Sequence, residues 1–151
     1  MIFREYDPSD LDSIVELEKR AFPIGPYTRP MIRKIFNTKG SFNFIAEENG
    51  RIMGYVIALP LDGKSADVES IAVDPDLHRG GLGSKLIRLI EEGMRQRSFQ
   101  YSVLEVRDMN EEAINFYKKH GYVAVTHLPM YYTQVFRGSR GAYRMVKKLY
   151  D

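Results

Sequence analysis

The sequence predicts an α/β (α+β) fold, with a mixed, mostly antiparallel, six- to seven-stranded sheet flanked by about four helices. Three observations support this. Asn49-Gly50 separates two strand-like runs and is a strong hairpin signal, because both residues tolerate positive φ. Strand–helix–strand patterns follow in the second half of the chain. Finally, the 151 residues are 44% hydrophobic and show no linker-like stretch, which predicts one domain over residues 1–151.

The first half of the chain begins with a short strand and two amphipathic helices. Leu11, Ile14 and Val15 show the three-to-four spacing of a helix. Residues 22–27 are rich in helix breakers, and Pro30 suits the first turn of the next helix. The elements expected here are a strand over 1–6, helices over 11–22 and 28–36, and strands over 42–47, 51–59 and 67–73.

The second half alternates helices and strands. A helix from Leu82 carries a continuous apolar stripe. A later helix has matched ends: Asn110 is suited to cap it, Glu111 lies at the positive end of its dipole, and Gly121 suits the left-handed position after it. The elements expected here are helices over 82–97 and 110–119, strands over 102–107, 122–127 and 142–149, and an aromatic and basic loop over 128–141.

Composition and charge exclude several classes of protein. There are 22 Lys+Arg and 20 Asp+Glu, and the net charge of +2 is too small to indicate nucleic-acid or membrane binding. No apolar run approaches the ~18 residues of a membrane span. Cysteine is absent, which excludes disulfides and a cysteine nucleophile, and the three histidines match no metal-ligand spacing. We therefore expect a cytoplasmic protein with no metal, no nucleic-acid partner and no membrane partner.

The most informative segment is a glycine-rich turn between a strand and a helix, at residues 73–84. Such a junction presents unpaired backbone N–H groups beside the positive end of a helix dipole, so it stabilises an anion such as a pyrophosphate. Arg79 would add a charge-assisted contact. The order Gly83-Ser84-Lys85 does not match the Walker A motif, and Gly81-Leu82-Gly83 lacks the third glycine of the dinucleotide fingerprint. A plain strand–helix connection is the alternative.

Two motifs resemble the GNAT (Gcn5-related) N-acetyltransferase superfamily. The family's acetyl-CoA loop reads Gln/Arg-x-x-Gly-x-Gly/Ala after a hydrophobic-Asp-Pro phrase. It is matched by His78-Arg79-Gly80-Gly81-Leu82-Gly83 after Val73-Asp74-Pro75, with His78 in place of Gln or Arg. The second motif is Leu104-Glu105-Val106-Arg107-x-x-Asn110-x-x-Ala113-x-x-Phe116-Tyr117-x-x-x-Gly121-Tyr122. It resembles the RimI/Ard1-like branch of the family, which acetylates protein N-termini.

The resemblance implies a single-domain GNAT fold and direct transfer of an acetyl group from acetyl-CoA to an amine, without a metal. It places the backbone of Ile71, Ala72 and Val73 beside the pantetheine arm. It places Asn110 and Tyr117 on the other side of the cofactor. Tyr117 would be the general acid for the departing thiolate, because a phenol with a pKa near 10 stays protonated at neutral pH. The residues that would hold the pyrophosphate are Arg79, Gly80, Gly81, Leu82, Gly83 and Ser84.

Glu105 is the first candidate for the general base, because RimI-like enzymes carry a glutamate on this strand. Alternation places Val103, Glu105 and Arg107 on one face. The alternative is a structural pairing of Glu105 with Arg107 or a lysine. Glu69, on the preceding strand, is the second candidate for the base, and a chain of water molecules is the third. For Tyr117 the alternative is a core aromatic side chain.

Reference pKa values favour an α-amine as the acceptor. At pH 7 an α-amine with a pKa near 7.8 is about a tenth neutral, whereas a lysine with a pKa near 10.4 is neutral to about 0.04%. We therefore expect protein or peptide N-termini as substrate. Tyr27 and Tyr131 lie on two aromatic loops and would contact the peptide. We expect a monomer or a weak homodimer.

Two other functions stay open. In the first, the acceptor is a lysine side chain or a small amine, such as a polyamine or an aminoglycoside. A small amine of this kind predicts an acidic acceptor pocket, and the sequence shows little acid outside Glu47-Glu48, Asp62 and Asp67. The second is a non-catalytic acyl-CoA-binding module, which would show no turnover.

Overall fold

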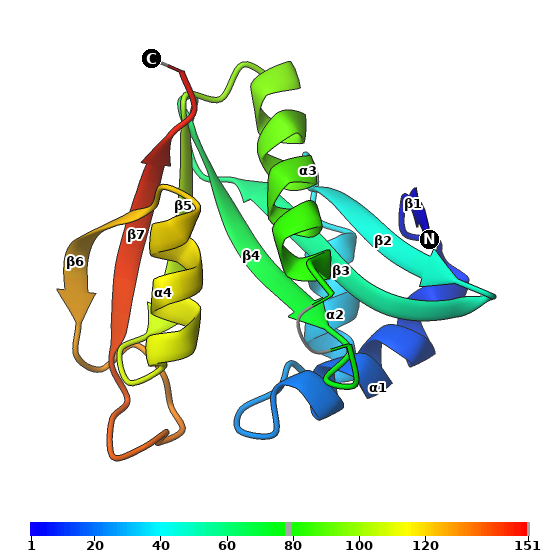
Figure 1. Ribbon diagram of the computed structural model, residues 1–151, viewed down its shortest axis with the longest axis horizontal. Coiled ribbons are helices and arrows are strands. Elements are labelled where there is room, and N and C mark those ends of the chain that lie inside the picture. Colours follow the sequence, from blue (N-terminus) through cyan, green and yellow to red (C-terminus); the bar gives the residue numbers. More distant parts are fainter. Residues whose placement is uncertain (78–79, 151) are drawn as a thin grey trace.

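The computed structural model describes residues 1–77 and 80–150, and their elements follow the expected order, with most boundaries within one or two residues (Figure 1). The elements are β1 (Ile2–Arg4), a 3-10 turn (Pro8–Asp10), α1 (Leu11–Ala21), α2 (Arg29–Phe36), β2 (Phe42–Glu48), β3 (Arg51–Pro60), β4 (Ser65–Val73), α3 (Leu82–Gln96), β5 (Tyr101–Arg107), α4 (Glu111–Lys119), β6 (Val123–Leu128) and β7 (Ala142–Lys148). Within these residues, no helix is both long and apolar enough to cross a bilayer.

The strands form one seven-stranded sheet in the order β1-β2-β3-β4-β5-β7-β6. Its neighbouring strands are antiparallel, except for β4 and β5, which are parallel. The predicted fold class is therefore confirmed. The parallel pair is short, because the register runs only from Ser65↔Tyr101 to Asp67↔Val103. Beyond it the two strands separate toward the start of α3 (Figure 1).

A bulge in β4 lies immediately after this short parallel pairing. Ile57 pairs with Ser70 and Ala58 pairs with Val68, so Glu69 is an extra residue opposite a single step of β3. An extra residue bends its strand and increases the local twist. The bend helps to carry β4 away from β5, and it turns the side chain of an acidic residue out of the regular alternation.

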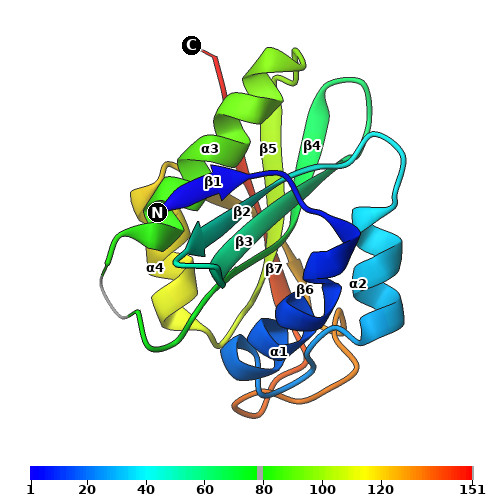
Figure 2. The ribbon, with the colours of Figure 1, turned by 90° about the vertical axis from the view of Figure 1, so that its right-hand side faces the viewer.

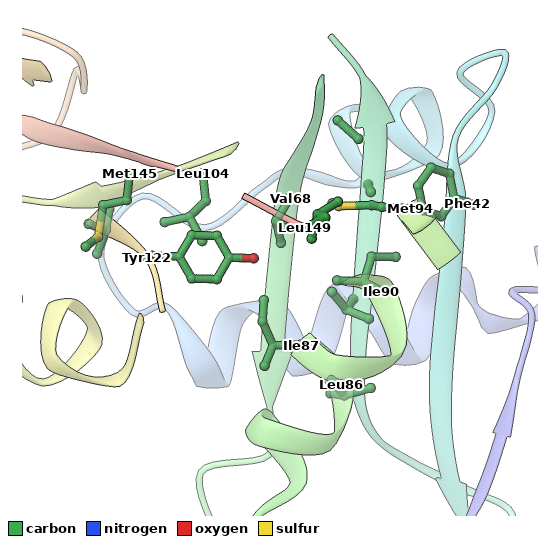
Figure 3. Close-up of a cluster of buried hydrophobic side chains, with 14 of the residues drawn as sticks. Phe42, Val68, Leu86, Ile87, Ile90, Met94, Leu104, Tyr122, Met145 and Leu149 are labelled. Carbon is green, nitrogen blue, oxygen red and sulfur yellow. The ribbon is translucent and has the colours of Figure 1, made fainter. Parts of the chain in front are cut away.

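The helices cover both faces of the sheet. Helices α1 and α2 lie on one face, and α3 and α4 lie on the other (Figure 2). Each face has its own apolar cluster. Figure 3 shows the larger cluster, in which side chains of α3 interdigitate with side chains of the strands. Its labelled members are Phe42, Val68, Leu86, Ile87, Ile90, Met94, Leu104, Tyr122, Met145 and Leu149.

Local sequence signals explain where several elements begin and end. Asn49 and Gly50 both have positive φ, at 52° and 76°, as the predicted hairpin requires. The side chain of Thr28 accepts a bond from the amide of Met31 and caps α2. Gly121 has φ 94° and follows α4 in the left-handed position that favours glycine.

A buried polar network joins α3 to the β5–β7 part of the sheet, at the level of the short β4–β5 pairing. The hydroxyl of Tyr122 donates to Glu91 on α3 at 2.9 Å, and it shares a hydrogen bond of 2.7 Å with Ser102 on β5. Lys147 on β7 donates to the other oxygen of Glu91 at 2.9 Å. Buried polar groups are tolerated when they are mutually satisfied, so this network ties α3 to β5 and β7.

The core makes a simple stability prediction. Leu86 on α3 is 0% exposed, and its replacement by alanine removes buried methyl groups and leaves a cavity. The expected loss in the free energy of unfolding is about 2–5 kcal/mol, measured by urea denaturation. Leu61→Ala is the matched control, because Leu61 is 57% exposed, and its effect should stay within about 0.5 kcal/mol. Equal losses in the two variants would contradict this packing.

Candidate active site

The glycine-rich turn leads into the start of α3. Gly81 precedes the helix with φ 74°, and among the described residues no side chain caps this end. The first backbone bond after the turn runs from the amide of Lys85 to the carbonyl of Gly81, at 3.0 Å. The amides of Leu82, Gly83 and Ser84 therefore have no partner within the helix, which is the arrangement that binds an anion. Arg79 and His78 lie outside the described residues.

Asp74, the first residue after β4, fixes the start of this turn. In the sequence, Asp74 is marked only as part of a motif. Its carboxylate accepts two bonds from Arg20 on α1, at 2.8 and 2.9 Å, and one from Arg51 on β3, at 3.1 Å. It also accepts from the amide of Asp76 at 2.9 Å. Burial alone would raise the pKa of Asp74, but the bonds from Arg20, the Asp76 amide and Arg51 hold it below its usual value.

The side chain of Ser84 joins α3 to α4. Its Oγ lies 2.9 Å from Nε2 of His120, the residue that follows α4. Burial lowers the pKa of His120, so the ring is neutral at pH 7. Because the hydroxyl of Ser84 is bonded to His120, we expect Ser84 to contact an anion through its backbone N–H.

One edge of β4 is open along its second half. Ile71, Ala72 and Val73 pair with β3 on one side. On the other side, the described residues of β5 pair with β4 no further than Asp67. In an antiparallel pair, alternate residues direct their N–H and C=O groups away from the partner strand. This edge therefore presents backbone donors and acceptors beside the start of α3.

Tyr117 lies on α4, half-buried against the larger core. Its ring packs edge-on against Phe116 at 5.3 Å and against Tyr122 at 5.9 Å between centroids. Its hydroxyl makes no hydrogen bond to a described residue. Burial raises the pKa of Tyr117 well above its usual value, so the phenol stays protonated at neutral pH. The predicted acid and the alternative core role are thus compatible: the ring packs while the hydroxyl keeps its proton.

Asn110 has a structural task that the sequence also predicted. Its Oδ1 accepts a bond from the amide of Ala113 at 3.2 Å and caps α4. A contact between Asn110 and a cofactor would therefore use the other atoms of its amide.

Three carboxyl groups gather where β4 and β5 part. Asp67 and Glu69 on β4 interact with Glu105 on β5. The expectation that acid is scarce outside Glu47-Glu48, Asp62 and Asp67 is therefore wrong for this site. Sequence separation concealed the cluster, because the parallel register of two strands brings its members together.

Glu105 pairs with Arg144. The two residues are register neighbours on β5 and β7, and Nε of Arg144 donates to Glu105 at 3.0 Å. Glu105 therefore does form an ion pair, as the alternative expected. The expected partner, Arg107 or a lysine, is wrong, because the partner is Arg144. The guanidinium of Arg107 instead stacks over Tyr132 at 4.0 Å and donates to the carbonyl of Gln134 at 3.0 Å. It fixes the loop between β6 and β7.

The α1–α2 loop reaches the same cluster through Tyr27. Its hydroxyl donates to Oε1 of Glu69 at 3.1 Å. Burial raises the pKa of Glu69, and the bond from Tyr27 limits the rise. Glu18, buried on α1, accepts from Tyr55 at 2.6 Å and from the amide of Tyr27 at 3.3 Å. Sequence reasoning missed Glu18 as a site residue, and its place within the apolar stripe of α1 was the available signal.

Tyr131 approaches the cluster from the loop between β6 and β7. Burial, together with Glu105 and Asp67, raises the pKa of Tyr131 to about 12. Its ring meets Tyr132 edge-on, with 4.9 Å between centroids. The two tyrosines singled out in the sequence, Tyr27 and Tyr131, are therefore brought to the same group of carboxylates.

A surface hollow of the protein lies away from the candidate active site. A hollow of about 480 Å³ lies at the far end of β5, lined by Ser98, Gln100, Tyr101, Lys148 and Tyr150. It holds no carboxylate and lies away from the open edge of β4. Among residues 1–77 and 80–150, no group of three or more His, Asp or Glu side chains is arranged to hold a metal ion.

Comparison with known proteins decides the family. Residues 11–122 match the Acetyltransferase (GNAT) family. The chain belongs to the GNAT family. An uncharacterized N-acetyltransferase of Methanocaldococcus jannaschii is 32% identical over 149 residues, which are 98% of this chain and 92% of that protein. This GNAT chain is an N-acetyltransferase, as its family and relatives indicate.

Solved structures agree with the fold of this GNAT enzyme. The ribosomal-protein-S18-alanine N-acetyltransferase of Escherichia coli superimposes with a TM-score of 0.89 at 26% identity, over 99% of this chain and 94% of that one. Ard1 of Thermoplasma volcanium superimposes with a TM-score of 0.87 at 28% identity, over 99% and 98% of the two chains. The resemblance to the RimI/Ard1-like branch is therefore confirmed.

The Asp74 cluster makes a pH-dependent prediction. Asp74→Asn keeps the shape of this 1% exposed side chain but removes its charge, and should lower the free energy of unfolding at pH 7 by about 1–3 kcal/mol. Because the pKa of Asp74 is lowered in the folded protein, its stabilisation is present above the unfolded value near 3.8 and is lost as the pH falls through the folded value. The difference between wild type and variant should therefore shrink in acid.

Asp76→Asn is the control for this measurement. Asp76 also contacts Arg20, at 2.9 Å, but its side chain is 78% exposed. Thermal unfolding followed by circular dichroism from pH 3 to pH 7 should show little change for this variant. A gap between wild type and Asp74→Asn that is constant over this range would contradict the assigned ionisation.

Proposed function

We propose that this GNAT enzyme transfers the acetyl group of acetyl-CoA to the α-amino group of protein or peptide N-termini, by direct attack of the amine. The observation that carries the proposal is the open edge of β4, which lies between the uncapped start of α3 and the carboxylate–tyrosine cluster. The pyrophosphate of a cofactor suits the uncapped start of α3, and an amide-bearing arm of the same cofactor suits the open edge of β4. An amine suits the carboxylate–tyrosine cluster. The similarity to an S18-alanine N-acetyltransferase supports the choice of an N-terminus.

The cofactor side of the proposal assigns contacts to backbone groups. The amides from Gly80 to Ser84 would hold the pyrophosphate, and Arg79 would add a charge. The free backbone groups of Ile71–Val73 would pair with the pantetheine arm, and an N–H of this edge would polarise the thioester carbonyl. Acetyl-CoA supplies the acetyl thioester. Asn110 and Tyr117 would border the same molecule from α4.

The acid–base side uses two groups from different strands. Glu105 would accept the proton of the acceptor amine, and the bond from Arg144 fixes the orientation of its carboxylate. Tyr117 would donate its proton to the departing thiolate, and its raised pKa means that the phenol still carries this proton at neutral pH. Glu69 is the alternative base, alone or through water, since it lies beside Tyr27 in the same cluster.

A second acceptor class has one observation in its favour. Three carboxyl groups at one place are what a small polycationic amine would need. Arg144 and Arg107 offset this charge, however, because both reach the same end of β5. Tyr27 and Tyr131 supply apolar area and hydroxyls, which suit the first residues of a peptide.

A peptide panel tests the acceptor. Purified protein is incubated with acetyl-CoA and short peptides that have free or blocked N-termini, each with or without lysine, and with a polyamine. Release of free thiol should require an unblocked N-terminus, because the α-amine has the larger neutral fraction. Release that follows lysine content or the polyamine instead would contradict the proposed acceptor. Cofactor uptake without any release would indicate a binding module.

Single substitutions test the acid and the base. Tyr117→Phe and Glu105→Gln should each lower kcat by about 100-fold, with the KM for acetyl-CoA nearly unchanged. Tyr150→Phe is the matched control for the tyrosine, because the Tyr150 hydroxyl donates to the backbone carbonyl of Arg95, away from the proposed site. Glu69→Gln is compared with Glu105→Gln. A larger loss of kcat in Glu69→Gln would move the base to Glu69.

A further inference from the structure

Asp67 lies at the closed end of the site, in the last pair of the parallel ladder, opposite Val103. Its side chain is buried, with the residue only 8% exposed. Its neighbours Ala66 and Val68 face the α3 core, so by alternation Asp67 faces the other side of the sheet. Glu105 faces that side too, because Leu104 and Val106 belong to the same core.

The carboxyl groups of Asp67 and Glu105 lie within hydrogen-bonding reach of each other. Two ionised carboxylates in contact repel each other, so a proton on one of them stabilises the contact. Arg144 donates to Glu105 at 3.0 Å, so a cation lies against Glu105. Within residues 1–77 and 80–150, no cation is bonded to Asp67, and its Oδ1 has no hydrogen-bond partner. The proton therefore belongs on Asp67.

We propose that Asp67 is a positioning residue, which stays protonated at neutral pH, donates a hydrogen bond to Glu105, and so holds the Glu105 carboxylate toward the acceptor amine. Its part in catalysis rests on the proposed function, whereas its protonation does not. No proton leaves Asp67 during turnover. Asp67 lies outside the motifs that carry the family resemblance, and nothing in its local sequence marks it.

The surroundings of Asp67 determine how it titrates. Burial is the first cause that raises the pKa of Asp67, to about 9, followed by Glu105 and Glu69, while Arg144 opposes the rise. Tyr131 and Tyr132 face the group from the loop between β6 and β7, and their own pKa values are raised to about 12. They stay neutral while Asp67 loses its proton. The charged and titratable groups around Asp67 are thus Glu69, Glu105, Arg144, Tyr131 and Tyr132.

Ionisation of Asp67 has a defined effect on activity and on stability. Above its pKa the donated hydrogen bond is lost, two adjacent carboxylates repel, and kcat should fall. The folded protein also retains a proton that the unfolded chain gives up near pH 3.8, so stability should decrease as the pH rises from that value through about 9.

The first experiment measures the proton directly, by ¹³C NMR of aspartate-labelled protein. The Asp67 carboxyl resonance is assigned as the one missing in Asp67→Asn. It should titrate with a midpoint near pH 9, and the midpoint should fall in Glu105→Gln, where the neighbouring charge is gone. If Asp67→Asn does not fold, the Asp67 resonance is assigned instead as the aspartate signal whose midpoint falls in Glu105→Gln. A wild-type midpoint below about pH 6 would overturn the proposal.

The second experiment measures turnover against pH. Asp67→Asn keeps a donor at every pH, so its kcat at pH 7 should match the wild type and its fall near pH 9 should be absent. Asp67→Ala should lower kcat about tenfold or more and leave the KM for acetyl-CoA unchanged. Asp62→Asn, at the exposed β3–β4 turn, is the control. An alkaline fall that persists in Asp67→Asn would overturn the positioning role.

These two experiments separate the possible failures. If the wild type acetylates no amine at all, the proposed function fails, but the NMR midpoint still decides whether Asp67 carries the proton. If acetyl transfer is found while Asp67 titrates as an ordinary aspartate, only the positioning role fails.

Discussion

The parallel pairing of β4 and β5 stops after Asp67↔Val103, and the arrangement of the site depends on this limit. Had the ladder continued, the edge of β4 from Ile71 to Val73 would be paired within the sheet. Because it ends, backbone groups near the middle of the sheet are left without a strand partner, and such groups favour a ligand that supplies hydrogen bonds. The bulge at Glu69 bends β4 where the pairing ends, and the buried Glu91 network ties α3 to β5 and β7 at the paired end.

The closed end of the same junction gathers charge instead of backbone groups. Three carboxyl groups lie near one another, and their mutual repulsion is met by Arg144 and by a proton. A carboxylate that is paired and largely buried is held in one orientation, which a proton acceptor needs. The open edge and the acidic end are therefore two consequences of one strand divergence, one suited to a cofactor and the other to an amine.

The acceptor side is assembled from segments that are far apart in the chain. Glu18 on α1 holds the backbone of Tyr27, and Tyr27 in turn contacts Glu69. Arg107 holds the loop that carries Tyr131, and His127 bonds to Asp108 at 2.9 Å at the base of that loop. Both loops are tied to the sheet by buried or stacked side chains. A rigid scaffold with tethered aromatic loops is a common basis for selective recognition.

The sequence by itself determined the order of the elements, the Asn49-Gly50 turn, the Asn110 cap and the glycine-rich start of α3. These features depend on contacts within a few residues, so local patterns predict them, and the family motif added Tyr117 and Glu105. Only the tertiary structure decided that Glu105 pairs with Arg144, 39 residues away, and that acid gathers at the junction. The reason is physical: strand register and a single bulged residue decide which distant side chains meet, and neither leaves a periodic signal in the chain.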